Sequence, residues 1–436
     1  MTEYTMFEYE EFVDNLKIEL KSYKSTPKEL WRETAYRFVN GFAAEEVRRL
    51  ISLKKRRNDG VFFTDSLLAE KVLDMLQPSF NKQSVVYDAA CGAGNLLIAA
   101  SNYLNKVRIQ PISKNYLLGT DIHSEFVGAA NLRLQMNNLL LLSKKTNDIA
   151  KQKNGYLIKI KTGLISNQFY KNATHIFLNP PFDQEKPDEK IGWAAGKVSM
   201  AAVFMEKAIL FANPGTTIMA ILPDVLRSGT RYEKWRNLVN KHCITERIEL
   251  LGQFDKHADV DVYAIKLVKR QEFTKTSIGQ GAKKTIQSNK SKRIRKPKVL
   301  KDLFDIRVGP VVDFRDEKIG NELPYIVSRG LESWAIQTEI PLTRKHQGKS
   351  FEGPFVVIKR TSRATDKNRA VATIINTAGA VYVDNHLVML MPKTKTVASC
   401  QLAIRILKNK KTNDWLNQEI RCRHLTVKAV MNIPLI

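Results

Sequence analysis

The sequence predicts an α/β protein with a mainly parallel sheet of the nucleotide-binding type, preceded by a helical N-terminal arm and followed by an α+β domain. From about residue 60 to 270, short β-rich runs such as "SVVYDAA" and "TTIMAILP" alternate with helical runs. This alternation implies crossover units, because parallel neighbours must be joined by a long return connection. β-rich stretches return after about residue 300 and are followed by one helical stretch, which indicates a second core.

These elements divide the chain into four segments. Residues 1–58 are expected to form the helical arm, since apolar residues recur there at three- and four-residue steps. Residues 59–270 hold the α/β domain. Residues 271–300 are rich in Lys and Arg and nearly free of apolar residues, which predicts an exposed basic linker. Residues 301–436 form the second domain.

Length and composition limit the class of protein. A chain of 436 residues with 43% hydrophobic residues is long enough for two globular cores. It has no uninterrupted apolar run of about 18 residues, and its acidic start, "MTEYTMFEYEEF", lacks a secretory apolar core, so we expect a cytoplasmic protein. The four cysteines lie far apart, without a pair at zinc-ligand spacing; we expect reduced thiols and no metal site.

The charge balance points to a polyanionic partner. The formal net charge is +26 and the pI is about 9.8. Lys and Arg in such excess create a field that attracts polyanions, and nucleic acid is the leading candidate. A membrane surface is the rival, but the sequence shows no basic amphipathic helix with a continuous apolar face.

A first candidate site lies in "VVYDAACGAGNLLIAA", where an apolar strand ends in Asp88 and a turn with Gly92 and Gly94 leads into a helix. This arrangement predicts a nucleotide-type pocket at the carboxyl end of a strand. The spacing matches neither G-x-G-x-x-G nor a Walker motif, so a dinucleotide or triphosphate fits poorly. S-adenosylmethionine fits better, because it has no phosphates and its sulfonium and amino groups suit nearby carboxylates.

Two further residues of this region have competing interpretations. Asp121 follows the next strand, where its carboxylate can accept hydrogen bonds from both ribose hydroxyls. The alternative is that Asp88 and Asp121 only cap the helices that follow them. Cys91 is a nucleophile candidate by type, but no partner base is indicated locally, and a small residue suits a tight turn.

A second candidate site is "IFLNPPFD", residues 176–183, where two prolines and an aromatic follow a short apolar strand. Prolines cannot extend the strand, so the turn serves another purpose. The Asn179 side-chain carbonyl and the Pro180 backbone carbonyl can accept the hydrogens of a ring-conjugated amino group and draw its nitrogen out of the ring plane. Pro181 stiffens the turn, and Phe182 offers a face on which a base can stack.

With these motifs in order, the chain resembles the gamma-class N6-adenine DNA methyltransferases, which include type I modification subunits. "GVFFTDSLLAEKVLDML" resembles their motif X, "DAACGAG" motif I, "GTDI" motif II and "NPPF" motif IV. The resemblance implies a Rossmann-like fold dependent on S-adenosylmethionine, with Phe63 and Thr64 at the cofactor's methionine end. Relatives commonly place an Asp in motif III, whereas "IKIKTGLISN" has none; Thr162 or a backbone group would substitute. The implied cofactor-binding set is Phe63, Thr64, Asp88, Ala89, Cys91, Gly92, Gly94, Asp121, Ile122 and Asn179.

The second domain is similar to the target-recognition domains of type I specificity subunits and of single-chain methyltransferases. Its closing stretches "GAVYVDNHLVMLMP" and "RHLTVKAVMNIPLI" carry that resemblance. A basic segment, "KRTSRATDKNR", is then a candidate DNA-facing loop, with a plain solvated loop as the alternative. In the motif VIII position, Tyr263 or Val262 would face the target base. The implied DNA-binding residues are Arg360, Arg363, Lys367, Arg369 and Tyr263.

The expected function is transfer of a methyl group from S-adenosylmethionine to the N6 amine of a flipped-out adenine in duplex DNA, in a restriction-modification or related role. Two alternatives stay open: a protein-glutamine or RNA N-methyltransferase, and a DNA-binding specificity protein that has lost catalysis. The segments leave no room for a fused nuclease. Two arrangements then stay open: a separate restriction endonuclease or specificity subunit as partner, or a solitary enzyme.

Overall fold

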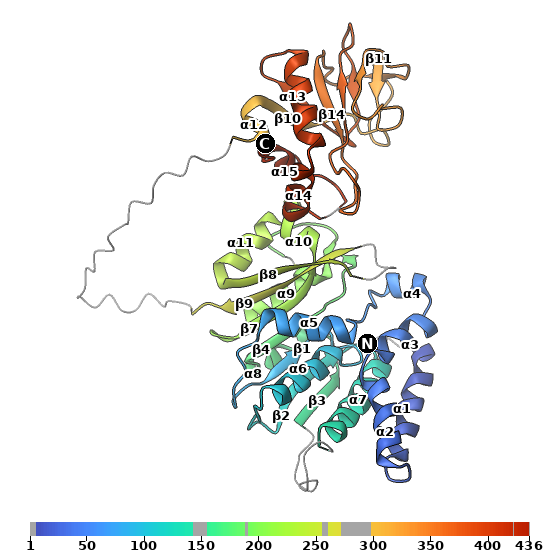
Figure 1. Cartoon of the computed structure of the whole chain (residues 1–436), viewed down its shortest axis with the longest axis vertical. Helices are drawn as coiled ribbons and strands as arrows, with labels where there is room; N and C mark the ends of the chain where they lie inside the picture. The colour runs from blue at the N-terminus through green and yellow to red at the C-terminus, as the bar shows by residue number, and fades with distance from the viewer. Residues whose placement is uncertain are drawn as a thin grey trace, which may run out of the picture. The chain divides into compact units, whose positions relative to one another are not determined.

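The computed structural model describes residues 6–142, 155–187, 191–254, 260–271, 298–421 and 423–435. Most of the expected basic linker, residues 272–297, lies outside the described residues. The chain divides into two compact units. The first comprises Met1–Leu226 with Arg231–Thr276, and the second comprises Ser277–Ile436 with Arg227–Thr230. Each is described by itself (Figure 1).

The first unit is built on a seven-stranded sheet in the order β3-β2-β1-β4-β7-β9-β8. All neighbours from β3 to β7 pair in parallel, and β9 runs antiparallel to both β7 and β8. The predicted parallel sheet is therefore confirmed, with one reversed strand near its edge. The strands are β1 (Val86–Asp88), β2 (Asn115–Asp121), β3 (Gly155–Ile160), β4 (His175–Leu178), β7 (Thr217–Pro223), β8 (Cys243–Gln253) and β9 (Asp261–Lys269).

Helices cover both faces of this sheet. Along β1, Val86 contributes to one apolar cluster and Tyr87 to the other, and both are fully buried. Because a strand turns successive side chains to opposite faces, a sheet covered on both sides needs nearly continuous apolar strands, as the sequence has. One face is covered by α5 (Ser66–Leu76), α6 (Asn95–Lys106) and α7 (Ser124–Leu142), and the other by α8 (Asn167–Asn172), α9 (Met200–Phe211) and α11 (Glu233–His242).

The N-terminal arm is helical, as predicted, but it belongs to the core of the first unit. The rings of Tyr9 and Phe126 lie 5.1 Å apart, and the Tyr9 hydroxyl donates to the carbonyl of Ala43 at 3.0 Å. Figure 1 shows the arm beside α7, which carries Phe126. The arm contains η1 (Phe7–Tyr9), α1 (Glu10–Ser22), α2 (Lys28–Val39), α3 (Phe42–Leu50) and α4 (Leu53–Asn58).

Three short elements and a hairpin complete the first unit. The strands β5 (Gln184–Glu185) and β6 (Val198–Ser199) pair antiparallel outside the main sheet. They follow the "NPPFD" turn, so the chain leaves the sheet at that turn and returns through β6 into α9. The remaining elements are η2 (Gly163–Ile165), α10 (Asp224–Ser228) and η3 (Thr230–Tyr232), of which the end of α10 and the start of η3 fall in the segment grouped with the second unit.

The second unit is an α+β structure with two sheets. A five-stranded sheet in the order β10-β17-β14-β15-β12 carries helices on one face and a three-stranded sheet, β13-β11-β16, on the other. Val356 of β14 faces the helices, whereas Val357 faces the smaller sheet. Leu300 is fully buried here and its amide bonds to Ile433, so this unit includes the last residues assigned by sequence to the linker.

The elements of the second unit follow in chain order. Its strands are β10 (Phe304–Val308), β11 (Asn321–Ile326), β12 (Ile336–Gln337), β13 (Thr343–His346), β14 (Phe355–Lys359), β15 (Ala372–Ile375), β16 (Tyr382–Val383) and β17 (Leu387–Pro392). Its helices are α12 (Leu300–Leu303), α13 (Val397–Lys408), α14 (Lys410–Glu419) and α15 (Val427–Met431). In the described parts of both units, no helix is both long and apolar enough to cross a membrane.

Candidate active site

The predicted site residues lie at one edge of the first unit's sheet. β2, β1 and β4 are neighbouring parallel strands, with Asp88 in register with Gly119 of β2 and with Phe177 of β4. Parallel strands place their carboxyl ends together. Asp88, Asp121 and Asn179, which end these three strands or directly follow them, therefore share one edge.

The turn after β1 has a backbone shape that requires glycine. Gly92 has φ +51° and Gly94 has φ +84°, values that favour glycine strongly. A Cβ on Gly92 would lie 2.7 Å from Cε1 of Phe63, so the Phe63 ring fills that space. The Gly92 amide donates to Oδ2 of Asp121 at 2.9 Å. The turn is thereby tied to the end of β2.

Asp88 and Asp121 are both buried, and their surroundings differ. Asp88 is 1% exposed and its Oδ1 accepts only a 3.2 Å bond from the Ala90 amide among the described residues. Burial raises the pKa of Asp88 to about 7, and the nearby Asp121 charge adds to that rise. Asp121 also accepts a bond from the His123 amide at 3.0 Å. An anionic pair of this kind favours a cationic ligand.

The other turn residues have structural surroundings. Burial raises the pKa of the Cys91 thiol well above its ordinary value, and Asp121 and Asp88 raise it further. Cys91 therefore fits the role of a small turn residue rather than a nucleophile. Ala89 is 1% exposed, and its carbonyl lies so close to Gly163 that position 163 has no room for a side chain. Ile122 is half-buried.

The residue expected to substitute for the motif III acid, Thr162, caps a turn. Its hydroxyl accepts a bond from the Leu164 amide at 3.2 Å, at the start of η2. The backbone of Lys161 donates to the Asp121 carbonyl at 2.8 Å, which holds this loop against β2. The Thr162 side chain thus has a local structural role.

Asn179 has one end of its amide fixed and the other end unpaired. Its Nδ2 donates to Oγ1 of Thr64 at 2.7 Å and to the Phe62 carbonyl at 3.4 Å. A backbone carbonyl can only accept, so the nitrogen must face it and the oxygen must face away. Oδ1 is buried and has no hydrogen-bond partner among the described residues. Such an orphaned acceptor is costly unless a ligand supplies a donor.

The turn after Asn179 is held by the segment before α5. A Cβ on Gly60, which has φ +63°, would lie 2.6 Å from Oδ1 of Asp183 and 2.7 Å from Cβ of Pro181. Pro180 is buried and Pro181 is half-buried. Residues 60–64 therefore contact residues 179–183 along their length, which brings the predicted motifs X and IV together.

Phe182 is half-buried and already contacts another ring. Its centroid lies 5.3 Å from that of Phe254, at an interplanar angle of 76°. The contact is edge to face, a favourable aromatic geometry. Phe254 thus fixes the orientation of the ring that the sequence predicts as a stacking face.

Sequence reasoning missed four residues that shape this site. Asp183 has a buried Oδ1 without a partner among the described residues, and burial together with Glu185 raises the pKa of this carboxyl to about 6. Gly60, Asn95 and Arg133 hold the surrounding segments. Gly60 begins motif X and Asn95 directly follows motif I, but Arg133 sits in mid-helix, and a lone arginine in a helical pattern carries no signal of burial.

Two of the expected DNA-facing residues are buried, which corrects their assignment. Tyr263 is 1% exposed within an apolar cluster on β9, and Val262 beside it is 0% exposed, so neither faces a base. Arg369 is 1% exposed, and its guanidinium donates to the Ile420 carbonyl and to the Asn417 side chain. These side chains hold their own unit together.

The rest of the basic segment is accessible. Arg363 and Lys367 are exposed. Arg360 is half-buried, with Nε 3.3 Å from the Leu425 carbonyl and Nη1 3.4 Å from the Asn385 carbonyl. Arg363 and Lys367 thus remain the members of the set that can reach a polyanion.

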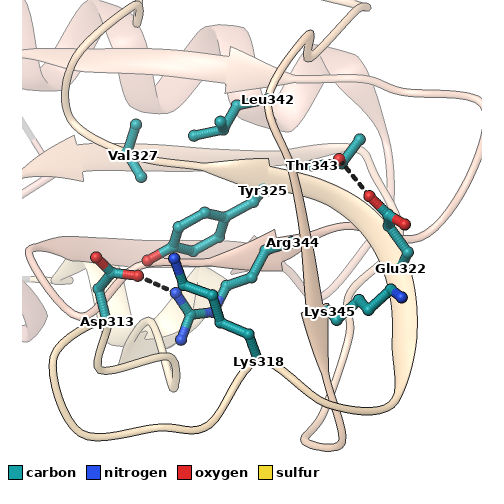
Figure 2. Close-up of a pocket in the computed structure, with 9 residues that line it drawn as sticks. All are labelled: Asp313, Lys318, Glu322, Tyr325, Val327, Leu342, Thr343, Arg344 and Lys345. Carbon is teal, nitrogen blue, oxygen red and sulfur yellow. Dashed lines mark hydrogen bonds and ion pairs between the residues drawn. The ribbon is translucent and has the colours of Figure 1, made fainter.

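The second unit has a cavity of about 430 Å³ beside β11 and β13. Figure 2 shows Arg344 beneath the Tyr325 ring and directed toward Asp313. The guanidinium lies 5.4 Å from the ring centroid and pairs with Asp313, while its Nε is buried without a partner among the described residues. The cavity is lined by Asp313, Lys318, Glu322, Tyr325, Val327, Leu342, Thr343, Arg344 and Lys345.

A comparison with protein families identifies the family to which this site belongs. The model of the N-6 DNA Methylase family matches residues 46–308, which is more than half of the 436 residues. The matched range includes the glycine turn, Asp121 and the "NPPF" turn. The chain therefore belongs to the N-6 DNA methylase family, a class of S-adenosylmethionine-dependent, adenine-specific DNA methyltransferases. No curated protein matched the sequence.

Among solved structures, one supports the fold, and two more are similar at a lower score. The type IIL restriction-modification enzyme MmeI, solved in complex with DNA, is 13% identical with a TM-score of 0.56, covering 90% of this chain and 70% of its own. At that identity the similarity shows the fold alone. The type IIG restriction endonuclease BpuSI is 15% identical with a TM-score of 0.45, covering 89% of this chain and 60% of its own. A Listeria monocytogenes class I methyltransferase is 17% identical with a TM-score of 0.41, covering 62% and 90%.

Proposed function

We propose that this chain transfers a methyl group from S-adenosylmethionine to the N6 amine of an adenine flipped out of duplex DNA, and that Asn179 receives that amine. One observation carries the proposal. The Asn179 side chain presents a buried, unpaired carbonyl oxygen at the same sheet edge as the Asp88 and Asp121 carboxylates. Because Thr64 holds the amide nitrogen of Asn179, the amide oxygen is already oriented to accept a hydrogen bond from the adenine amine.

The residues present fit S-adenosylmethionine. The Phe63 ring packs against Gly92 of the turn, and we propose that this ring forms one wall of the cofactor site. The Asp88 and Asp121 carboxylates suit a ligand whose reactive and amino groups are cationic. We propose Phe63, Asp88, Gly92 and Asp121 as the principal contacts. Bound there, the cofactor would supply an electrophilic methyl group.

The protein's part in the chemistry is to make the amine nucleophilic. The lone pair of an exocyclic adenine amine is delocalised into the ring. Hydrogen bonds from its two protons to Asn179 Oδ1 and to the Pro180 carbonyl would favour a tetrahedral nitrogen, whose lone pair is then directed outward to accept the methyl group that the cofactor would supply. The surplus proton leaves to water, since an N-alkylated ammonium of this kind is acidic. Phe182 stacks on the ring.

Duplex DNA suits the charge of the chain. A net charge of +26 supplies phosphate contacts that dominate affinity and make it fall with salt. An N6 amine paired inside a duplex can be reached only by base extrusion. We also propose that the protein acts in the cytoplasm.

We propose that the second unit recognises the target sequence and that the cavity at Arg344 contributes readers. Its wall carries cations at Lys318 and Lys345 and carboxylates at Asp313 and Glu322. Phosphates offer only acceptors, so this mixed wall fits a base edge, which presents both donors and acceptors, better than it fits a phosphate. Arg363 and Lys367 would contribute phosphate contacts.

The assay that tests this function compares three substrates. The protein is incubated with labelled cofactor and duplex DNA, structured RNA or a glutamine-containing protein, and the modified atom is identified by mass spectrometry. We expect label on DNA N6-methyladenine. Label on RNA or glutamine would favour the alternative transferases, and cofactor-independent, sequence-selective DNA binding without label would favour a specificity protein. A restriction endonuclease or specificity subunit encoded separately is the protein partner that this role predicts.

A further inference from the structure

We infer that Thr64 is a positioning residue for Asn179, and that a chain of side-chain hydrogen bonds through Asn95 and Arg133 ties this amide to the glycine turn and to the N-terminal arm. The inference rests on the proposed function, because it names the residues that would hold Asn179, the proposed acceptor of the adenine amine, in place. It differs from the role that the family resemblance implies for Thr64, which is contact with the cofactor.

The Thr64 hydroxyl is committed to Asn179. The residue is 4% exposed, and its Oγ1 lies 2.7 Å from Nδ2 of Asn179. With the Phe62 carbonyl, it occupies the nitrogen end of the amide. Loss of this contact would leave one weak bond of 3.4 Å to hold the amide plane.

Thr64 is itself fixed through its backbone. Its carbonyl accepts a bond from Nδ2 of Asn95 at 2.5 Å, and Oδ1 of Asn95 accepts one from Nη1 of Arg133 at 2.7 Å. Asn95 is the first residue of α6, directly after the glycine turn. The same asparagine therefore bridges the segment that holds Asn179 and the helix that begins at the turn.

Arg133 anchors the chain in the arm. It is 0% exposed, and its guanidinium donates to the carbonyls of Phe38 at 2.9 Å and Val39 at 2.6 Å, and also to the carbonyl of Ala93 in the glycine turn. A buried arginine is tolerated only when its donors are satisfied in this way. The arm, the glycine turn and the acceptor amide thus share one buried hydrogen-bonded support.

The arrangement has a functional consequence. A displacement of Ala93 in the turn, or of Asn95 directly after it, would be transmitted to Thr64 and then to the Asn179 amide through bonds shorter than 3 Å. Seating of the cofactor on the turn and orientation of the acceptor oxygen are therefore coupled. Removal of a residue that positions another side chain is expected to lower the rate about 10- to 100-fold, by analogy with residues that hold metal ligands in place.

The test uses the full chain with Thr64→Val, which keeps the shape and removes the hydroxyl, and Thr64→Ser, which keeps the hydroxyl. We expect Thr64→Val to lower kcat on duplex DNA about 10- to 100-fold while the calorimetric Kd for S-adenosylmethionine changes less than about twofold. Thr64→Ser should restore most of kcat. A weakened Kd with unchanged kcat would overturn the inference and favour cofactor contact.

A second readout does not depend on activity. In ¹⁵N NMR spectra of the cofactor-free protein, the side-chain NH₂ of Asn179, assigned by its loss in Asn179→Asp, should exchange with solvent faster in Thr64→Val than in wild type or Thr64→Ser. Unchanged exchange would overturn the inference. Failure of wild type to methylate DNA would contradict the proposed function alone, because the exchange comparison would still stand.

Asn95→Asp probes the next step in the chain. This substitution keeps an acceptor for Arg133 but replaces the donor that faces the Thr64 carbonyl. We expect it to lower kcat, and to lower it by less in the Thr64→Val background than in wild type, because both changes release the same amide. Fully multiplicative effects would contradict a shared support.

Discussion

The carboxylate of Asp121 accepts a hydrogen bond from the backbone amide of Gly92 at 2.9 Å, so the end of β2 holds the glycine turn that follows β1. This contact gives Asp121 two roles, because the same carboxylate is the proposed partner of the cofactor ribose. It also accepts the His123 amide at 3.0 Å. In the proposed site, one residue thus supports the turn and would also hold the ligand.

Substitution of Asp121 should separate these roles. Asp121→Asn removes the charge and keeps only one of the two oxygens that accept the Gly92 and His123 amides, so we expect cofactor binding to weaken about tenfold, equivalent to ~1.4 kcal/mol, with a smaller loss of Tm than in Asp121→Ala. Asp121→Ala also leaves the buried Gly92 amide unpaired, which costs about 1–3 kcal/mol and should lower Tm. Calorimetry and thermal denaturation measure the two effects. Equal cofactor affinity in wild type and Asp121→Ala would remove Asp121 from the binding site.

The raised pKa of Asp88 predicts a pH dependence for cofactor binding. Its folded pKa is about 7, above the ordinary 3.8, so the charged form is disfavoured in the free protein. That penalty is absent below about pH 4 and grows as pH rises toward 7, where it lowers the free energy of unfolding. A cationic ligand favours the charged carboxylate.

Cofactor affinity should therefore increase as pH rises from 6 to about 7 and level off above it, approaching tenfold per unit well below the pKa. Asp88→Asn should bind more weakly and show little slope over the same interval. Titration calorimetry at several pH values provides the comparison. A wild-type profile as flat as that of the variant would show that Asp88 does not ionise on binding.

Crowding at Gly60 predicts a loss of activity. Gly60→Ala would force a Cβ to within 2.6 Å of Asp183 Oδ1 and 2.7 Å of Pro181 Cβ, and would disturb the turn that carries Asn179. The matched control is Gly215→Ala, because Gly215 has φ +84° with nothing within 4 Å of the added atom. Both substitutions place alanine at positive φ, which costs roughly 1–2 kcal/mol.

Only Gly60→Ala should reduce kcat, by at least about tenfold given the sensitivity of catalysis to misplacement of about 1 Å. Methylation rates measured below the melting transition of both variants decide the matter. If the two variants lose activity equally, backbone strain rather than crowding of the turn would explain it.

Recognition by the second unit is tested at its cavity. Lys318→Ala with Lys345→Ala removes two cations from the wall, and Lys410→Ala with Lys411→Ala removes two exposed cations from α14. We expect the first pair to change which adenines are methylated, and the second to weaken DNA binding evenly across sequences. Methylation-sensitive sequencing measures both. An unchanged target sequence in the cavity variant would place the readers elsewhere.

The sequence was sufficient for the mainly parallel sheet and for the polar residues at the strand ends, but not for the order of the strands within the sheet. The strand and helix alternation predicted the parallel sheet, and Asp88, Asp121 and Asn179 were found because polar residues at apolar strand ends are locally visible. Tyr263 was misassigned, since its burial depends on β7 and β8 pairing beside it, which alternation does not reveal. Arg369 was misassigned for a similar reason: three of its hydrogen-bond acceptors, on Asn413, Asn417 and Ile420, lie more than forty positions away in the sequence.

The support beneath the site was also beyond sequence reasoning. Nothing in "NLRLQM" distinguishes Arg133 from an exposed helical arginine, because its acceptors at Phe38 and Val39 lie in the arm. Only the fold brings the arm, the glycine turn and the segment before α5 together. Long-range contacts of this kind determine how the acceptor is held, whereas local motifs determine only which residue it is.

The most direct test of the central claim compares wild type with Asn179→Ala. Both are incubated with duplex plasmid DNA and labelled S-adenosylmethionine, cofactor affinity is measured by calorimetry, and modified bases are mapped by methylation-sensitive sequencing. The account predicts N6-methyladenine within one short sequence for wild type, and for Asn179→Ala a loss of at least about 10²-fold in rate with cofactor affinity nearly unchanged. Equal methylation by the two proteins would contradict it.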